Sequence, residues 1–281
     1  MLLVTRRFPR GAALAACCAV AACDRPAPEQ ARGPNVVTVS AGEFAFGMPD
    51  TIPAGVTTFR LVNTGQEPHH AVLMQITEPK TTQEVMAAIG QPGPPPAWLR
   101  FPPGPNVAVP GDSSNATSVL EPGRYLFVCF ISSPDGTMHA MKGMTKEFVV
   151  TGVVPAGAEL PAADVVITLK DFDFELSQPL TAGSHTIQVV NAGPQLHEVG
   201  FEQLAPGKTI EDYRAWATAA EQGPPPTRPV GGLIGPHPGS GMGTFTVTLA
   251  PGKYLLTCYV PDGSDGKPHV AHGMLKEIEV T

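Results

Sequence analysis

The sequence predicts an all-β protein that consists of two tandem Greek-key β-sandwich domains, each with a short insertion that contains a helix. Three observations predict this class. Short runs of β-branched and aromatic residues alternate with polar residues and end at glycine or proline, as antiparallel strands do. The same order of runs occurs twice, with about 115 residues in each copy, which suits a sandwich domain. The hydrophobic content of 42% can fill two cores, so we assign the 32 prolines and 30 glycines to turns and loops.

Residues 1–22 have the pattern of a secretory signal. Arginines precede an apolar run over residues 11–22, which is too short to span a membrane permanently. The sequence Val-Ala-Ala-Cys ending at Cys23 resembles a bacterial lipobox, which implies a lipid-modified Cys23 at the mature N-terminus. Cys17 ends a second possible box but leaves a shorter apolar core. Arg6-Arg7 leaves open a twin-arginine export route beside the ordinary one.

These features predict an exported protein, periplasmic or at the cell surface, that meets a membrane only through its N-terminal lipid anchor. Removal of the signal leaves a net charge of about −10. A surface of that sign repels phosphate backbones, so we expect no nucleic-acid partner.

Two domains and their connections follow from the repeated runs. A tether is expected at residues 23–34, and a linker at residues 152–163 joins domain 1 (residues 35–151) to domain 2 (residues 164–281). The expected strands lie within residues 35–46, 52–63, 71–76, 122–130 and 146–151 of domain 1, and within residues 164–176, 180–191, 198–204, 251–259 and 276–281 of domain 2.

Each domain carries an insertion between its third expected strand and the strand that ends at a cysteine. Apolar spacing predicts a helix over Thr81–Ile89 in domain 1 and over Thr209–Ala220 in domain 2. A proline run follows each helix and stiffens the chain. We interpret these runs as a rigid cover over the sandwich, with a polyproline docking motif as the alternative.

Four chemically distinctive residues recur at nearly constant spacing. They are His69 and His197, Cys129 and Cys258, His139 and His269, and Met144 and Met274, with offsets of 128, 129, 130 and 130 residues. Constant spacing indicates that a site was duplicated together with its fold. A disulfide bond between the two cysteines is the alternative, but each cysteine ends an apolar run that belongs to the core of its own domain.

At these positions the sequence resembles the cupredoxins, the blue-copper family that includes plastocyanin and azurin. The resemblance rests on a histidine before a hydrophobic strand, on Pro-Gly-[Arg/Lys]-Tyr-x3-Cys, and on His-x4-Met. It implies a cupredoxin-like fold and one copper ion per domain, with a methionine as the axial ligand of each. The implied ligands are His69, Cys129, His139 and Met144 in domain 1, and His197, Cys258, His269 and Met274 in domain 2.

Two features depart from the family pattern. The cysteine and the next histidine are separated by nine residues in domain 1 and by ten in domain 2, more than in plastocyanin or azurin, and Asp-Gly pairs in this segment indicate a turn. The residue after the first histidine is His70 or Glu198, where plastocyanin has asparagine. His272 competes with His269 as a ligand, but the matching position in domain 1 is Lys142, which favours His269.

The donor set suits copper better than zinc. A thiolate and two imidazoles with a distant thioether serve both copper oxidation states, whereas a closed zinc site favours four strong ligands. We therefore expect an electron carrier with two type 1 copper sites and a redox protein partner, such as a basic cytochrome. Copper storage or delivery, and a metal-free interaction module, are the alternatives. We expect no enzyme, because neither cysteine has a histidine beside it and the chain has no His-x-His pair.

Overall fold

Alternating residues form strands in both copies of the repeated sequence, called here the first repeat (residues 35–151) and the second repeat (residues 164–281). In β4 (Gly55–Asn63), for example, Thr57, Phe59 and Leu61 face the core while the residues between them are less buried. The other strands of the first repeat are β1 (Asn35–Gly42), β2 (Ala45–Gly47), β3 (Thr51–Pro53), β5 (Val72–Ile76), β6 (Leu99–Arg100), β7 (Gly104–Pro105), β8 (Ser113–Leu120), β9 (Gly123–Val128) and β10 (Thr145–Thr151). Those of the second repeat are β11 (Val165–Lys170), β12 (Asp173–Leu176), β13 (Gly183–Asn191), β14 (Glu198–Leu204), β15 (Thr227–Ile234), β16 (Gly243–Leu249), β17 (Gly252–Thr257) and β18 (Leu275–Val280).

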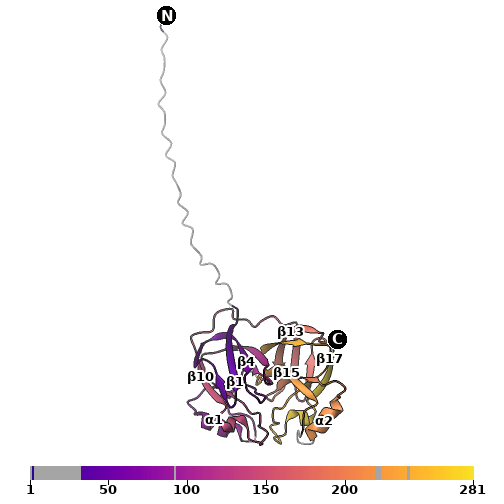
Figure 1. Cartoon of the computed structure of the whole chain (residues 1–281). Coiled ribbons are helices and arrows are strands. Elements are labelled where there is room, and N and C mark those ends of the chain that lie inside the picture. Colours follow the sequence, from indigo (N-terminus) through magenta and orange to yellow (C-terminus); the bar gives the residue numbers. More distant parts are fainter. Residues whose placement is uncertain (1, 3–32, 92, 219–222, 239–240) are drawn as a thin grey trace. The chain divides into compact units, whose positions relative to one another are not determined.

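This computed structural model describes residues 2, 33–91, 93–218, 223–238 and 241–281. The predicted signal, the candidate lipid site Cys23 and nearly all of the tether lie outside the described residues. Residues 33–281 form one compact unit, drawn in colour in Figure 1. None of the helices within the described ranges has the length and apolar character needed to cross a membrane.

The strands form three sheets that confirm the predicted all-β sandwich class. One sheet has eight strands in the order β12-β11-β13-β16-β8-β4-β1-β2, and therefore runs through both repeats. The other sheets have five strands each, in the orders β3-β10-β9-β5-β6 and β18-β17-β14-β15-β7. In each repeat several neighbours along a sheet are far apart in sequence, such as β4 and β8 or β13 and β16, as in a Greek-key arrangement.

Aromatic side chains fill the space between the facing sheets of the first repeat. The ring of Phe59 on β4 lies 4.9 Å from that of Phe127 on β9 and 5.8 Å from that of Phe148 on β10. In the second repeat, Phe201 on β14 and Phe245 on β16 make the corresponding contact at 5.5 Å. These ring contacts pack one sheet against the other. They thereby fix the positions of the strands whose ends carry the candidate ligands.

Two short helices cover the sandwiches as the apolar spacing predicts. Helix α1 (Thr82–Ile89) begins after Thr81, whose hydroxyl and backbone form a capping box with Glu84. Helix α2 (Ile210–Thr218) begins one residue after Thr209, and the last two residues of the predicted helix lie outside the described residues. Two 3₁₀ helices, η1 (His139–Lys142) and η2 (His269–His272), follow the loops after the cysteines.

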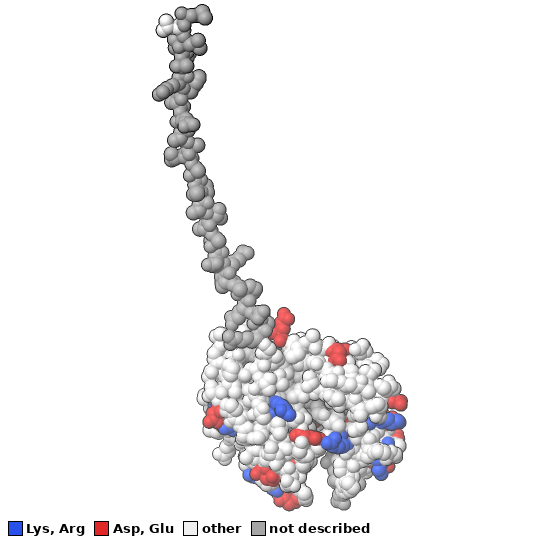
Figure 2. Space-filling model, turned by 45° about the horizontal axis from the view of Figure 1, so that its top comes forward, with Lys and Arg blue, Asp and Glu red and all other residues white. Residues whose placement is uncertain are grey.

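The two repeats share backbone pairing as well as side-chain contacts. Strand β8 adjoins β16 through Thr117 and Thr244, and β7 of the first repeat pairs with Leu233 and Ile234 of β15. The Asn115 side chain donates to the Thr246 carbonyl at 2.8 Å. On the face shown in Figure 2, charged side chains are scattered among neutral ones and do not gather into one patch.

Candidate metal centres

Three candidate ligands of the first repeat converge in its core. His69 Nδ1 lies 3.1 Å from His139 Nδ1, and Cys129 Sγ lies 3.4 Å from the same nitrogen. All three side chains are fully buried, and their ligand atoms form one group that can hold a metal ion. They come from the loop before β5, the end of β9 and the start of η1.

The second repeat builds the same group from the matching residues. His197 Nδ1 lies 3.0 Å from His269 Nδ1. Cys258 Sγ lies 3.4 Å from His269 Nδ1 and 4.0 Å from His197 Nδ1. These three residues are fully buried too. Both cysteines are free thiols, so the structure has no disulfide bond between Cys129 and Cys258.

Each candidate axial methionine is tied to the other ligand candidates through its backbone. Met144 N–H donates to the His139 carbonyl at 2.9 Å, and the Met144 carbonyl accepts from Cys129 N–H at 3.2 Å. Met274 N–H donates to the His269 carbonyl at 3.0 Å. Both methionine side chains are fully buried, and each belongs to the core that contains its cysteine. The structure thus brings all four predicted ligands of each repeat to one place.

The long loops between cysteine and histidine are closed at their base. In the first repeat, Ser132 bridges Met138 and His139 N–H donates to the Ile131 carbonyl at 2.8 Å. In the second, Pro261 bridges Pro268. The extra residues therefore form an excursion outside these bridges, and they leave the cysteine and the histidine adjacent.

An asparagine side chain positions the first histidine of each centre. Asn63 Nδ2 donates to the carbonyls of Glu67 and Ala108 at 2.7 and 2.8 Å, and its Oδ1 accepts from Gly65 N–H. Ala108 in turn exchanges two backbone hydrogen bonds with His69, of 3.1 and 2.8 Å. Asn191 makes the matching contacts in the second repeat. The asparagine six residues before each histidine thus fixes the loop that carries it.

The residue after the first histidine supports the segment after the cysteine in both repeats. His70 Nε2 accepts from Phe130 N–H at 2.8 Å, and Glu198 Oε1 accepts from Tyr259 N–H at 2.8 Å. Glu198 N–H also points at Cys258 Sγ, at 3.4 Å. Histidine and glutamate therefore make the same backbone contact, although their chemistry differs.

Carboxylates and phenylalanines surround the imidazole rings, and the sequence analysis missed them. Glu67 accepts from His139 Nε2 at 2.9 Å, and Asp171 contacts His197 Nε2 at 2.5 Å. The ring of Phe44 lies 5.0 Å from that of His139, and Phe172 lies 5.1 Å from His269 at the matching position. The signal that would have identified the phenylalanines is their offset of 128 residues.

Burial sets the protonation of the candidate ligands in the metal-free protein. It raises the pKa of the Cys129 thiol to about 11 and shifts the pKa of Cys258 in the same direction. Burial also lowers the pKa values of His69 and His197, and it lowers that of His269 to about 4. These three imidazoles are therefore neutral at pH 7 and the thiols protonated, so binding a metal ion displaces a thiol proton at each centre.

The residues fit a copper ion. Nitrogen and sulfur ligands bind divalent metals at about 2.0–2.3 Å, so atoms around one ion lie about 3.3–3.8 Å from one another. The nitrogen and sulfur atoms of both groups approach these separations. Nε2 of His69 and of His269 is buried without a hydrogen-bond partner, so each of these rings makes its hydrogen-bond contacts through Nδ1, the nitrogen that faces the other ligand candidates. A thiolate, two imidazoles and a nearby methionine are the donor set that copper prefers.

Other histidines stand apart from the two ligand groups. His272 is 28% exposed and pairs with Asp265 at 3.1 Å, so His269 is the histidine beside Cys258. His185 pairs with Asp164 near the surface. Asp262, Asp265 and His272 form a third group that can hold a metal ion, at the edge of the second centre.

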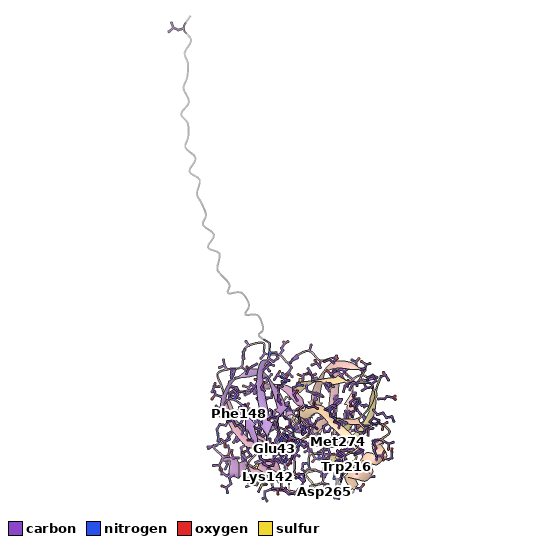
Figure 3. All side chains as sticks on the ribbon, viewed as in Figure 1. Glu43, Lys142, Phe148, Trp216, Asp265 and Met274 are labelled. Atoms are coloured by element: carbon purple, nitrogen blue, oxygen red, sulfur yellow. The ribbon has the colours of Figure 1, made fainter. Side chains whose placement is uncertain are left out.

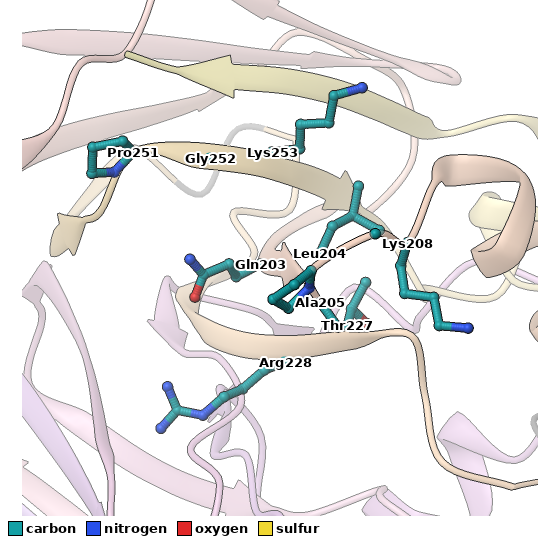
Figure 4. A pocket seen from close by; sticks show the side chains of 11 residues that line it. Gln203, Leu204, Ala205, Lys208, Thr227, Arg228, Pro251, Gly252 and Lys253 are labelled. Atoms are coloured by element: carbon teal, nitrogen blue, oxygen red, sulfur yellow. The ribbon is translucent and has the colours of Figure 1, made fainter.

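The surface pocket drawn in Figure 4 does not coincide with either centre. Lys208, Arg228 and Lys253 contribute its basic side chains. Arg228 is paired with Asp112, and Lys253 with Glu277 at 2.7 Å. Because two of the three cations are neutralised, this pocket supports no assignment.

Comparison with solved structures gives matches of low identity and low TM-score. No protein-family model and no curated protein sequence matches the chain. An auracyanin from Roseiflexus castenholzii is 22% identical over 42% of this chain and 98% of its own, with a TM-score of 0.29. A multicopper oxidase is 13% identical over 88% of each chain, with a TM-score of 0.24. A copper-containing nitrite reductase from Thermus scotoductus is 13% identical over 88% of this chain and 61% of its own, with a TM-score of 0.23.

The prediction that the chain is not an enzyme is wrong. It rested on the absence of a histidine beside either cysteine and of a His-x-His pair, but the structure assembles histidine, cysteine and histidine into one group in both repeats. The criterion failed because it considered only neighbours in the sequence, whereas the two histidines of a group lie 70 or 72 positions apart.

Proposed function

We propose that the chain binds one copper ion at each centre and uses both ions to transfer electrons. The observation that carries this proposal is the duplicated convergence of one thiol and two imidazole nitrogens, with a buried methionine held beside them. When bound, copper supplies a one-electron couple. The buried surroundings keep the ligand atoms in place in either oxidation state, which favours fast electron exchange.

Voltammetry of the copper-loaded full chain tests this function. We expect reversible one-electron waves from both centres, and Cys258→Ser should remove only the contribution of the second centre. Copper that binds tightly but exchanges no electrons reversibly would contradict the proposal and would favour storage or delivery of copper.

We further propose that the protein works outside the cytoplasm, attached through Cys23, with a basic redox protein as its partner. The basic start and lipobox-like sequence support export, and the net charge of about −10 that remains after removal of the signal supports a basic partner. Binding to a cationic cytochrome should weaken as salt is raised, because exposed charges are screened. Mass spectrometry of the protein purified from membranes tests the lipid on Cys23.

Oxidoreductase activity is the second candidate function. The group formed by Asp262, Asp265 and His272 favours it, because it offers a further metal position next to the second centre. His269 Nε2 lies 3.8 Å from Asp262 Oδ2, so the two positions adjoin. Oxygen uptake with a phenolic electron donor tests this function, and Asp265→Asn should abolish the uptake while leaving the copper at the second centre.

A further inference from the structure

An aromatic cluster connects the second centre to helix α2. Tyr213, a residue of α2, is fully buried, and Tyr259 and Trp216 pack against the same small cluster as Leu204 and Leu255. This cluster lies on the outer side of β14 and β17, away from the core between the sheets. Aliphatic side chains would be enough to fill this space, yet three aromatic side chains lie next to one another here.

The three rings form a continuous sequence of contacts that starts at the cysteine. Tyr259 follows Cys258 directly in the chain, so its ring is attached through a single peptide unit. Its hydroxyl is hydrogen-bonded to the hydroxyl of Tyr213. The Tyr213 ring lies 5.7 Å from the ring of Trp216, one helical turn further along α2. From Cys258 to Trp216, each residue is therefore joined to the next by covalent bonds, by a hydrogen bond or by a ring contact.

The last ring of this sequence reaches the molecular surface. Trp216 is half-buried, and its indole N–H donates to the Gly223 carbonyl at 3.2 Å. Figure 3 labels Trp216 on the α2 side of the second repeat. The neighbouring residues Glu211 and Arg214 on α2 are exposed.

Within the described part of the first repeat, the matching positions carry no such sequence of rings. At the positions that match Tyr259, Tyr213 and Trp216 it carries Phe130, Val85 and Ala88. Phenylalanine, valine and alanine have no hydroxyl to join and are difficult to oxidise. The asymmetry therefore distinguishes the second centre from the first in a molecule whose ligand candidates are duplicated.

We infer that Tyr259, Tyr213 and Trp216 form an electron path between the second centre and the surface at α2, where Trp216 exchanges electrons with a one-electron redox partner. This inference rests on copper binding at the second centre. One electron passes along the three rings for each encounter, so the centre is oxidised by one electron as the partner is reduced by one, or the reverse. The electron tunnels between the centre and Trp216 through the two tyrosine rings, so neither tyrosine is itself oxidised and both hydroxyls keep their protons.

Flash photolysis of the full chain tests the path. A ruthenium polypyridyl complex with a sacrificial acceptor supplies a one-electron photo-oxidant in solution, and the Cys129→Ser background leaves only the second centre visible. With copper reduced beforehand, the tryptophan radical should decay as the thiolate-to-copper absorption band of the second centre grows. Tyr213→Phe and Tyr259→Phe keep the rings but remove the shared hydrogen bond. Each variant should leave the tryptophan radical long-lived. The copper absorption band should then grow as slowly as it does in Trp216→Phe.

Trp98→Phe is the matched control, since Trp98 and Trp216 are the two tryptophans of the chain and Trp98 lies on the first repeat. It should leave the growth of the band unchanged. Unaltered kinetics in Tyr213→Phe and Tyr259→Phe, with the copper band intact, would overturn the path and leave the proposed copper binding standing. Absence of a copper band in Cys129→Ser, and also in the unaltered chain, would instead overturn the copper function itself.

Discussion

At the scale of single residues, the carboxylates near the histidines differ between the repeats more than the candidate ligands do. Glu67 contacts His139, but Gln195 occupies its matching position, and the carboxylate near His269 comes instead from Asp262. The ligand candidates could be predicted because their types and spacing recur. The carboxylates could not, because a different element supplies the same charge in each repeat.

The carboxylate of Asp171 should strengthen copper binding at the second centre. A carboxylate that accepts from the outer nitrogen of a ligating histidine fixes the ring and raises its basicity. Asp171→Asn should weaken copper binding there by about 10–100-fold, as measured by competition with a chelator of known affinity. The control is Asp173→Asn, which removes an exposed partner of Lys276 two residues away and should leave the affinity unchanged.

The buried Glu198 carboxyl should make the metal-free protein less stable as pH rises. Burial raises the pKa of Glu198 to about 7, so between about pH 4.3 and 7 the unfolded chain releases this proton first. Unfolding is therefore favoured increasingly across this window. Relative to Glu198→Gln, the free energy of unfolding should fall by up to about 3 kcal/mol.

Urea titrations of both chains from pH 4 to pH 8 measure this difference. Glu175→Gln, which alters a carboxylate that is 55% exposed, serves as the control and should show no such trend. A stability difference between Glu198→Gln and the unaltered chain that stays constant with pH would contradict the effect of burial.

At the scale of elements, the turn between the second histidine and the methionine determines where the methionine lies in each centre. Gly143 ends η1 with φ of 102°, and its N–H donates to the carbonyls of His139 and Ala140. Gly273 does the same at η2 with φ of 96°. This left-handed backbone turns the chain so that the methionine enters the core immediately after the histidine.

A side chain at Gly143 should destabilise the first centre through the backbone alone. A Cβ atom there would meet no atom within 4 Å, so Gly143→Ala is expected to cost about 1–2 kcal/mol from the left-handed conformation. Gly143→Asn should cost less, because asparagine tolerates this conformation. Denaturant unfolding of both variants measures the costs. Equal costs for alanine and asparagine would show that backbone conformation is not the cause.

Strand prediction succeeded for segments such as β4, but it missed three longer strands, β8, β15 and β16. The core-facing residues of β4 alternate with less buried ones over its whole length, so its period was visible. Strands β6 and β7 have two residues each, and no period can be detected in so short a segment. The pairing of β7 with β15 also depends on contact between repeats, which local sequence does not encode.

At the scale of the whole molecule, shared sheets join the two repeats. The eight-stranded sheet contains strands of both, and β7 extends a sheet of the second repeat. The core cluster around α1 likewise includes Ile234 of β15. Because the repeats share both sheet and core, we expect residues 33–281 to unfold as one cooperative unit.

Calorimetry of the metal-free full chain should therefore show a single transition. Leu233 is fully buried where β15 meets β7, so Leu233→Ala should cost about 2–5 kcal/mol and shift the whole transition. Val153→Ala, at a position 81% exposed between the repeats, should leave it in place. Two resolved transitions, of which only one moves in Leu233→Ala, would contradict a shared unit.

Titration of the full chain with Cu(II), followed in the visible region, tests most directly whether both centres bind copper through their cysteines. We expect an intense thiolate-to-copper band that saturates at two equivalents, one for each ligand group. The band should fall by about half in Cys129→Ser and in Cys258→Ser. It should vanish in the double variant, which also reports any signal from the other three cysteines, Cys17, Cys18 and Cys23. No band in the unaltered chain, or a band that keeps its full intensity in the double variant, would contradict the two copper centres.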